Sequence, residues 1–413
     1  MTKRQSKKSM KIKLAVMSDL HCHLSEESDP VTQRIVRPES SFLTVGALRR
    51  PSTHHPIQAL VDLIHDQTMA TEALLVPGDL ANQASQEGLA HAWDSVLEIG
   101  RELRAQYVIP VLGNHDLDTH KVRGTRTPTH AAEFLRPGFP FASPLSCQQF
   151  LSEGYCVLPL TPEVEIILVN TVIDYSDRSV AKRGSFPIER VENLRQTVGL
   201  LPRPKIRIAM MHHHPILHST KFMNVNDVIE TGDQLLSALR EVGCGLVIHG
   251  HKHEPRLTQV NIPTGSIAVF AAGSFSAMLG QISSVARNLF HLVQVESLDS
   301  PDVILRGSIT SWEWAKGSGW VKALLFPHHI GFGRRVTLET MLGQLRKLAA
   351  SKRLRQSFNH DEILVAAPEL QYSSDDDVSQ MSGELRKDRL KFAKPGGVFE
   401  LGKLNQVKGF TKR

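Results

Sequence analysis

The most constraining feature of this sequence is the stretch Tyr107–Asp116, YVIPVLGNHD. Its apolar, partly β-branched run is typical of a buried strand, which ends at Gly113. Three polar side chains that are able to bind metals follow at once: Asn114, His115 and Asp116. A strand that ends in such a cluster predicts a site at the carboxyl edge of a sheet, where open α/β folds place their chemistry.

Four other short apolar runs end in the same way, and we expect them to be strands at residues 12–19, 72–76, 206–211 and 245–249. A further strand is expected at 165–169, and the apolar spacing predicts helices at 56–67, 88–103, 187–200 and 228–242. Such alternation of strands and helices indicates an α/β fold in layers. Beyond residue 255 the helical spacing fades, and the runs at 268–272, 289–295 and 303–305 predict a second sheet packed against the first.

The charged residues are unevenly distributed along the chain of 413 residues. The net charge is +6, but residues 1–13 and residues 380–413 carry +6 each, which leaves −6 for the body between them. We expect a basic disordered arm at 1–11, one large domain at 12–330, a C-terminal helical extension at 331–370 and a disordered basic tail at 371–413. The basic ends are able to attract nucleic acid, whereas the composition of the body does not favour it.

The sequence also bears on membrane insertion, secretion and disulfide bonding. No apolar run approaches the ~20 residues that a membrane span requires. The apolar stretch Leu14–Met17 is too short for the core of a signal peptide, so we expect a cytoplasmic protein. The four cysteines show no CxxC spacing, and therefore neither a zinc knuckle nor a disulfide framework is indicated.

The polar groups at the five strand ends share one chemistry. They are carboxylates, an amide and imidazoles, without a thiolate, and they lie in Asp19-Leu20-His21, Gly78-Asp79, Gly113-Asn114-His115-Asp116, His213-His214-Pro215 and Gly250-His251-Lys252-His253. That set suits Mn, Fe, Zn or Ni better than a structural zinc site. Since the groups outnumber the ligands of one ion, we expect two ions ~3.5–4 Å apart with one aspartate between them.

The order of these motifs, DxH, GD, GNHD, HxP and GHxH, resembles the calcineurin-like metallophosphoesterase family. The resemblance covers roughly residues 11–296 and includes all five motifs. It implies a four-layer αββα double β-sandwich, and it makes residues 12–330 a metallophosphoesterase domain. It further implies a dinuclear centre of divalent or trivalent ions and a phosphoester substrate.

The resemblance also implies a role for each matching residue. Asp19, His21 and His253 would hold the first metal, and Asn114, His213 and His251 the second, with Asp79 bridging both. His213 is chosen because the family ligand precedes proline by two positions, and His212 and His214 are left as neighbours. His115 would contact the substrate phosphate and protonate the leaving oxygen, and Asp116 would orient His115 through its second ring nitrogen.

The expected reaction is hydrolysis of a phosphodiester, with a cyclic nucleotide as one candidate, by attack of a metal-bound hydroxide. GDLAN together with GNHD and HHHP resembles the class III cyclic-nucleotide phosphodiesterase branch. The residues after Asp79 lack the GDxVDRG pattern of the family's protein phosphatases. Asn82 stands where purple acid phosphatases place a tyrosine, so no iron-tyrosinate centre is expected.

Three alternatives stay open. The basic ends favour a nuclease of the same family, whose DNA binding would weaken steeply with salt. A phosphomonoesterase of the same family is the second. The third is a scaffold that binds metal without catalysis, although such relatives usually lack ligands and no ligand is missing here.

Overall fold

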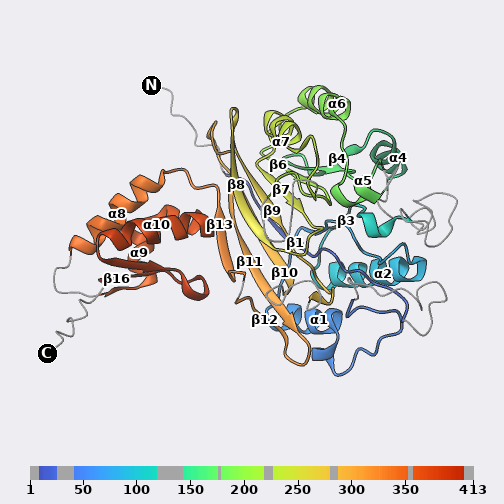
Figure 1. Cartoon of the computed structure of the whole chain (residues 1–413), viewed down its shortest axis with the longest axis horizontal. Helices are drawn as coiled ribbons and strands as arrows, with labels where there is room; N and C mark the ends of the chain where they lie inside the picture. Colours follow the sequence, from blue (N-terminus) through green and yellow to red (C-terminus); the bar gives the residue numbers. More distant parts are fainter. Residues whose placement is uncertain are drawn as a thin grey trace.

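The computed structural model describes residues 9–25, 41–118, 143–174, 178–217, 227–279, 287–324, 326–351 and 357–403. Two sheets lie face to face at the centre, with helices outside them (Figure 1). This arrangement confirms the predicted α/β double sandwich. Most of the predicted basic arm, residues 1–8, and residues 404–413 of the predicted tail lie outside the described residues.

The first sheet has seven strands in the order β12-β11-β10-β1-β2-β3, with β13 paired to β11. Its parallel part consists of β1 (Lys11–Val16), β2 (Ala73–Val76) and β3 (Tyr107–Pro110). The antiparallel part consists of β10 (Asn288–Ser297), β11 (Leu305–Ala315), β12 (Gly319–Lys322) and β13 (His329–Phe332). Helices α1 (Pro56–Asp66) and α2 (Gln86–Glu102) pack beside this sheet.

The second sheet has six strands in the order β4-β5-β6-β7-β9-β8. They are β4 (Tyr155–Thr161), β5 (Val164–Val169), β6 (Ile206–Met210), β7 (Leu246–His249), β9 (Gly265–Ala271) and β8 (Arg256–Ile262). Helices α6 (Ile188–Gly199) and α7 (Gly232–Glu241) cover its outer side, and α4 (Pro144–Ser152) packs beside the edge strand β4 (Figure 1). The short α5 (Arg178–Arg183) lies near the end of β6, where the carbonyl of Ala181 contacts His213. Since β5, β6 and β7 are parallel, their carboxyl ends share one edge of the sheet.

The expectation for the late strands was wrong in one respect. The run at 268–272 does join the second sheet as β9, but the run at 289–295 becomes β10 and pairs antiparallel with β1 in the first sheet. Residues 303–304 precede β11, which begins at Leu305. Apolar spacing indicates that a segment is a strand, but it does not specify the partner strand.

The main hydrophobic core fills the space between the sheets. Its fully buried members include Leu14 and Leu75 from the first sheet and Ile208 and Phe270 from the second. A second core lies between the second sheet and helices α6 and α7. None of the described helices is both long and apolar enough to cross a membrane.

Residues 338–403 form a small α/β unit with a third core, which lies beyond β13 in Figure 1. It contains α8 (Leu338–Ser351), α9 (His360–Ala366), α10 (Asp375–Lys387) and an antiparallel sheet of β14 (Ser357–Phe358), β16 (Glu400–Lys403) and β15 (Leu390–Ala393). The predicted disorder from residue 371 was therefore wrong for residues 371–403. The acidic run Asp375–Asp377 is the first turn of α10, where negative charge stabilises a helix, and Ser374 caps that turn.

Candidate metal centre

The five strand ends predicted from the sequence meet in one place. β1, β2 and β3 of the first sheet and β6 and β7 of the second direct their carboxyl ends to this region. Ligand atoms of Asp19, His21 and His253 lie within 4.8 Å of one another, and so do those of His212, His213 and His251. A further group of the same kind, Asp19, Asp79 and His212, links the two clusters.

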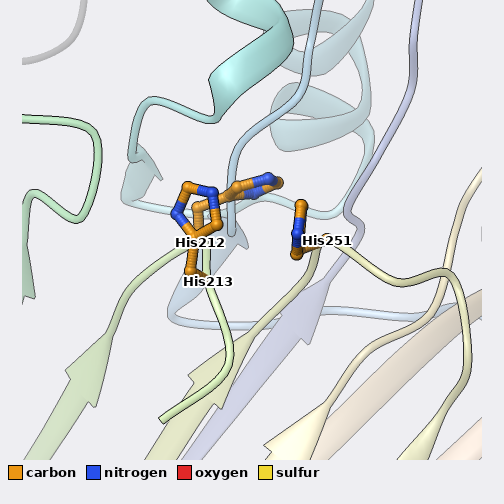
Figure 2. Close-up of side chains that lie close together, drawn as sticks. All are labelled: His212, His213 and His251. Atoms are coloured by element: carbon orange, nitrogen blue, oxygen red, sulfur yellow. The ribbon is translucent and has the colours of Figure 1, made fainter. Parts of the chain in front are cut away.

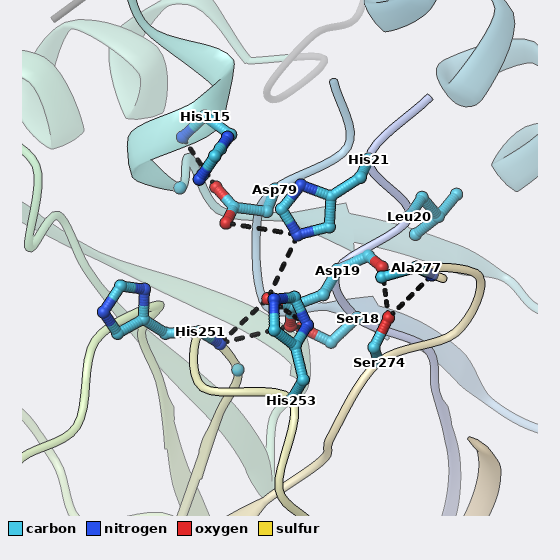
Figure 3. A network of polar contacts seen from close by, with 12 residues as sticks. Ser18, Asp19, Leu20, His21, Asp79, His115, His251, His253, Ser274 and Ala277 are labelled. Atoms are coloured by element: carbon cyan, nitrogen blue, oxygen red, sulfur yellow. Dashed lines mark hydrogen bonds and ion pairs between the residues drawn. The ribbon is translucent and has the colours of Figure 1, made fainter. Parts of the chain in front are cut away.

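The first cluster surrounds the carboxylate of Asp19 (Figure 3). Its Oδ1 lies 3.8 Å from His21 Nε2 and 3.7 Å from His253 Nδ1. Its Oδ2 accepts a hydrogen bond of 2.6 Å from Ser18 Oγ, and the backbone N–H of His251 donates to Oδ1 at 3.0 Å. All three of the cluster's side chains are buried, so two imidazoles and a carboxylate face one another without bulk water.

In the second cluster the ring of His212 lies beside the rings of His213 and His251 (Figure 2). His212 Nδ1 donates to the carbonyl of Pro77 at 2.7 Å, which leaves a lone pair on Nε2 in the neutral ring. That Nε2 lies 3.2 Å from Asp79 Oδ2 and 3.2 Å from Asn114 Oδ1. Three acceptor atoms therefore converge on one point, an arrangement that only a cation or a proton stabilises.

The pKa values of His212 and Asp79 are shifted because these buried groups lie close together. Burial alone would lower the pKa of His212, but the negative charge of Asp79 outweighs it and raises that pKa to about 9. Burial would likewise raise the pKa of Asp79, yet the imidazoles of His212 and His115 hold it well below its ordinary value. The Asp79 carboxylate is thus an anion that attracts positive charge from both clusters.

His251 is oriented by backbone groups. Its ring Nε2 donates to the carbonyl of Lys182 at 2.7 Å, so Nδ1 keeps its lone pair. A backbone carbonyl that fixes the tautomer of an imidazole in this way is a frequent support for metal ligands. Burial lowers the pKa of His251 well below its ordinary value, which keeps the ring neutral and able to coordinate.

The backbone around the clusters adopts uncommon conformations. Positive φ angles occur at Asp19 (55°), His21 (49°), Asp79 (52°), His251 (86°) and His253 (56°), none of which is glycine. Such conformations cost of order 1–3 kcal/mol each and occur most often at functional sites. Neighbouring glycines make the approach possible, because a Cβ on Gly113 would lie 2.1 Å from Asp79 Oδ1.

The donor atoms fit metal ions. Among the described residues, His253 Nδ1 is a buried polar atom without a hydrogen-bond partner, which is a costly state unless a ligand binds it. Imidazole, carboxylate and amide groups suit transition-metal ions, and the set with Asp79 at its centre exceeds the needs of one ion. The site is therefore chemically suited to two metal ions.

Comparison with known proteins agrees with this geometry. A family model for calcineurin-like phosphoesterases matches residues 12–255. The chain belongs to the calcineurin-like phosphoesterase family. It is a metal-dependent phosphoric ester hydrolase. No curated protein matches its sequence.

Solved structures show limited similarity to this phosphoesterase. The purple acid phosphatase PPD1 from yellow lupin (Lupinus luteus) seeds has a TM-score of 0.45 and 11% identity, with 79% of this chain and 54% of that chain covered. The chain thus spans about half the length of that phosphatase. PhoD gives a TM-score of 0.43 and 10% identity, with 78% and 70% covered. The phosphopantetheinyl hydrolase PptH from Mycobacterium tuberculosis gives 0.31 and 13%, with 63% and 89% covered.

The expected choice of His213 as a ligand fits the structure of this phosphoesterase less well than His212. Nε2 of His213 donates to the carbonyl of Ala181 at 3.0 Å, and Nδ1 lies 2.8 Å from Thr171 Oγ1, so both ring nitrogens have partners. His212, one position nearer to the end of β6, faces Asp79 instead. His213 nevertheless belongs to the same group of side chains as His212 and His251, so the choice of His213 as a ligand stays a prediction.

The role expected for Asp116 is also corrected. Its two carboxylate oxygens accept from the backbone N–H groups of Ala81 and Gly113 at 2.8 Å each, so Asp116 holds the GD and GNHD loops together. Burial, together with the charge of Asp79, raises the pKa of Asp116 to about 7. The ring Nδ1 of His115 instead lies 3.2 Å from Oδ1 of Asn82, a residue without a role in the sequence analysis.

Proposed function

We propose that this phosphoesterase hydrolyses a phosphodiester at a dinuclear metal centre. Asp19, His21 and His253 would hold one ion, and Asn114, His212 and His251 the other. The observation that carries the proposal is the position of Asp79 between the clusters, with Oδ2 3.7 Å from His21 Nε2 and 3.2 Å from His212 Nε2. A single carboxylate shared by two such sets is the arrangement that a pair of bridged ions needs.

Two bound cations would supply a hydrolytic nucleophile near neutral pH and would neutralise charge on the phosphoryl oxygens. The chain supplies orientation and a proton. His115 is half-buried, its backbone N–H donates to Asp79 Oδ1 at 2.8 Å, and its ring lies edge-on to His21 with centroids 4.8 Å apart. The carbonyl oxygen of Asn82 accepts from Nδ1, so Nε2 is the nitrogen that would exchange a proton with the leaving oxygen.

Two lysine side chains lie beside the site and share one carboxylate. Lys252 lies between His251 and His253 in the chain, and its ammonium is 3.0 Å from the buried carboxylate of Asp227. Lys182 is 3.4 Å from the same carboxylate. The single Asp227 carboxylate therefore offsets one of the two ammonium charges, and a charge of +1 remains beside the site to attract an anionic substrate. A cyclic nucleotide is the substrate class that the GDLAN and GNHD motifs suggest.

The direct test is Mn²⁺-dependent turnover of bis(p-nitrophenyl) phosphate beside p-nitrophenyl phosphate, with the Asp79→Asn variant as the control. We expect faster turnover of the diester, and its loss in the variant. Preference for the monoester would contradict the assigned substrate class. Metal-loaded protein that hydrolyses neither ester, nor any cyclic nucleotide, would favour the scaffold alternative.

A further inference from the structure

A cavity of about 980 Å³ lies at the opposite end of the second sheet from the metal centre. Residues just before β6, the end of α7, the turn before β9 and the loop after β10 line it. Lys205, which lines the cavity, and His212 at the metal centre are seven positions apart along an extended segment, roughly 23 Å at about 3.3 Å per residue. A molecule in this cavity would therefore not touch the catalytic groups.

Arg240 is the most unusual side chain of the lining. Only 4% of its surface is exposed. Nε donates to the carbonyl of Ser266 at 3.1 Å, and Nη2 donates to the carbonyls of Pro301 and Asp302. In the described part of the chain no carboxylate lies within ion-pair distance of this guanidinium, and Nη1 has no partner. The charge of Asp302 acts on this guanidinium only from beyond ion-pair distance, so the buried positive charge is only partly compensated, which is costly.

Arg203 brings a second guanidinium to the same place. Its Nη2 donates to the backbone carbonyl of Glu241, and its exposed side chain also lacks a carboxylate within ion-pair distance among the described residues. Burial, and next the charge of Arg203, lower the pKa of Arg240 below its ordinary value. Two like charges thus stand close together, and an anion between them would relieve their repulsion.

The remaining charges of the lining are largely balanced. Its other cations are paired: Lys205 with Glu163 (2.6 Å), Arg306 with Glu296 (3.1 Å) and Arg335 with Glu369 (3.1 Å). Its acidic residues are Glu241, which lies 3.7 Å from Arg195, Glu296 and the exposed Asp299. The excess positive charge is therefore concentrated at Arg203 and Arg240, while Ser9, Thr264 and Ser300 offer hydroxyl groups beside it.

We propose that this cavity is a second ligand site, separate from the metal centre, and that it binds a small phosphorylated anion between Arg203 and Arg240. Guanidinium pairs form charge-assisted, bidentate hydrogen bonds with phosphate oxygens. The volume lies within the range of small-molecule sites, so the space admits a ligand larger than inorganic phosphate.

The test uses inorganic pyrophosphate and isothermal titration calorimetry on the full chain in the Asp79→Asn background, which disables the metal centre. We expect the background protein to bind pyrophosphate and Arg203→Gln to weaken that binding at least tenfold. Arg101→Gln, which removes one exposed charge from α2, a helix that does not line the cavity, should change it less than twofold. Arg240→Met should also abolish binding while the melting temperature shows that the variant is folded.

Three results would overturn the proposal. Absence of pyrophosphate binding to the Asp79→Asn protein would mean either that the cavity binds no phosphorylated anion or that the metal centre is the anion site. Unchanged binding in Arg203→Gln would exclude the guanidinium pair. Equal losses in Arg203→Gln and Arg101→Gln would indicate attraction by overall charge. None of these results depends on whether the metal centre hydrolyses a diester.

Discussion

Substitution of His212 by glutamine tests the revised ligand set most directly. His212 Nε2 stands 3.2 Å from both Asp79 Oδ2 and Asn114 Oδ1, whereas both ring nitrogens of His213 already have hydrogen-bond partners. Loss of a group that merely supports a ligand costs ~10–100-fold in metal affinity. Loss of the ligand itself should exceed that range, so we expect the second ion to bind more than about 100-fold more weakly, or about 2.7 kcal/mol.

His213→Gln is the matched control, because it removes the neighbouring imidazole of the same run. It should keep both ions and lose at most two buried hydrogen bonds, to Thr171 and Ala181, at about 1 kcal/mol each in the free energy of unfolding. Its melting temperature should therefore fall more clearly than its metal content.

The assay is the number of Mn²⁺ ions per chain after loading and desalting, combined with the Mn²⁺ concentration that half-activates diester turnover. We expect two ions for the parent chain and for His213→Gln, and one for His212→Gln. If His213→Gln instead loses an ion while His212→Gln keeps two, the geometric argument for His212 is refuted.

Three further changes test other parts of the molecule. Asn82→Ala should lower kcat about 10–100-fold without loss of metal, because His115 loses the hydrogen-bond partner of its Nδ1. The loss should be larger for a diester with an alkyl leaving group than for p-nitrophenyl esters, and equal losses for both would contradict the role of His115 in protonating the leaving oxygen. Burial lowers the pKa of His291 to about 4, so between pH 6.5 and 4 the unfolded chain binds more protons than the folded chain, and the free energy of unfolding falls as the pH drops. His291→Gln should remove up to about 3 kcal/mol of this pH dependence in denaturant titrations, and an unchanged pH dependence would contradict the lowered pKa of His291. Met381→Ala should destabilise the unit at 338–403 by about 2–5 kcal/mol, measured by limited proteolysis, while diester turnover stays unchanged.

The sequence predicted the strands that position the site because each is a buried apolar run that stops abruptly at polar residues. β2 (Ala73–Val76) and β7 (Leu246–His249) are buried throughout, so every residue of each run had to be apolar or sheltered. The two edge strands of the second sheet were missed. β4 contains Pro159, which usually argues against a strand, and β8 is only partly buried and carries polar residues.

The sequence did not specify how the turn after β6 orients its three histidine rings. His212, His213 and His214 are chemically identical, and their order does not show which ring faces Asp79. The answer depends on hydrogen bonds to distant backbone carbonyls, Pro77 for His212 and Ala181 for His213. Likewise, GNHD predicted a site, but only the folded loop shows that Asp116 bonds to backbone N–H groups while Asn82 lies beside His115.

The energetics of the centre predict that folding and metal binding are coupled in this chain. Five of the residues assigned to ligand positions have positive φ, at about 1–3 kcal/mol each, which amounts to a sum comparable with the ~5–15 kcal/mol net stability of an ordinary protein. The buried ring nitrogen Nδ1 of His253, which has no hydrogen-bond partner, adds to that cost. Such a geometry persists because the two sheets and the backbone bonds of Asp116 hold the loops in place, and cations that bind the folded form only would offset the strain by mass action. The same sheets and backbone bonds keep the ligands at fixed positions before any ion arrives, which is the preorganisation that electrostatic catalysis of phosphoryl transfer requires.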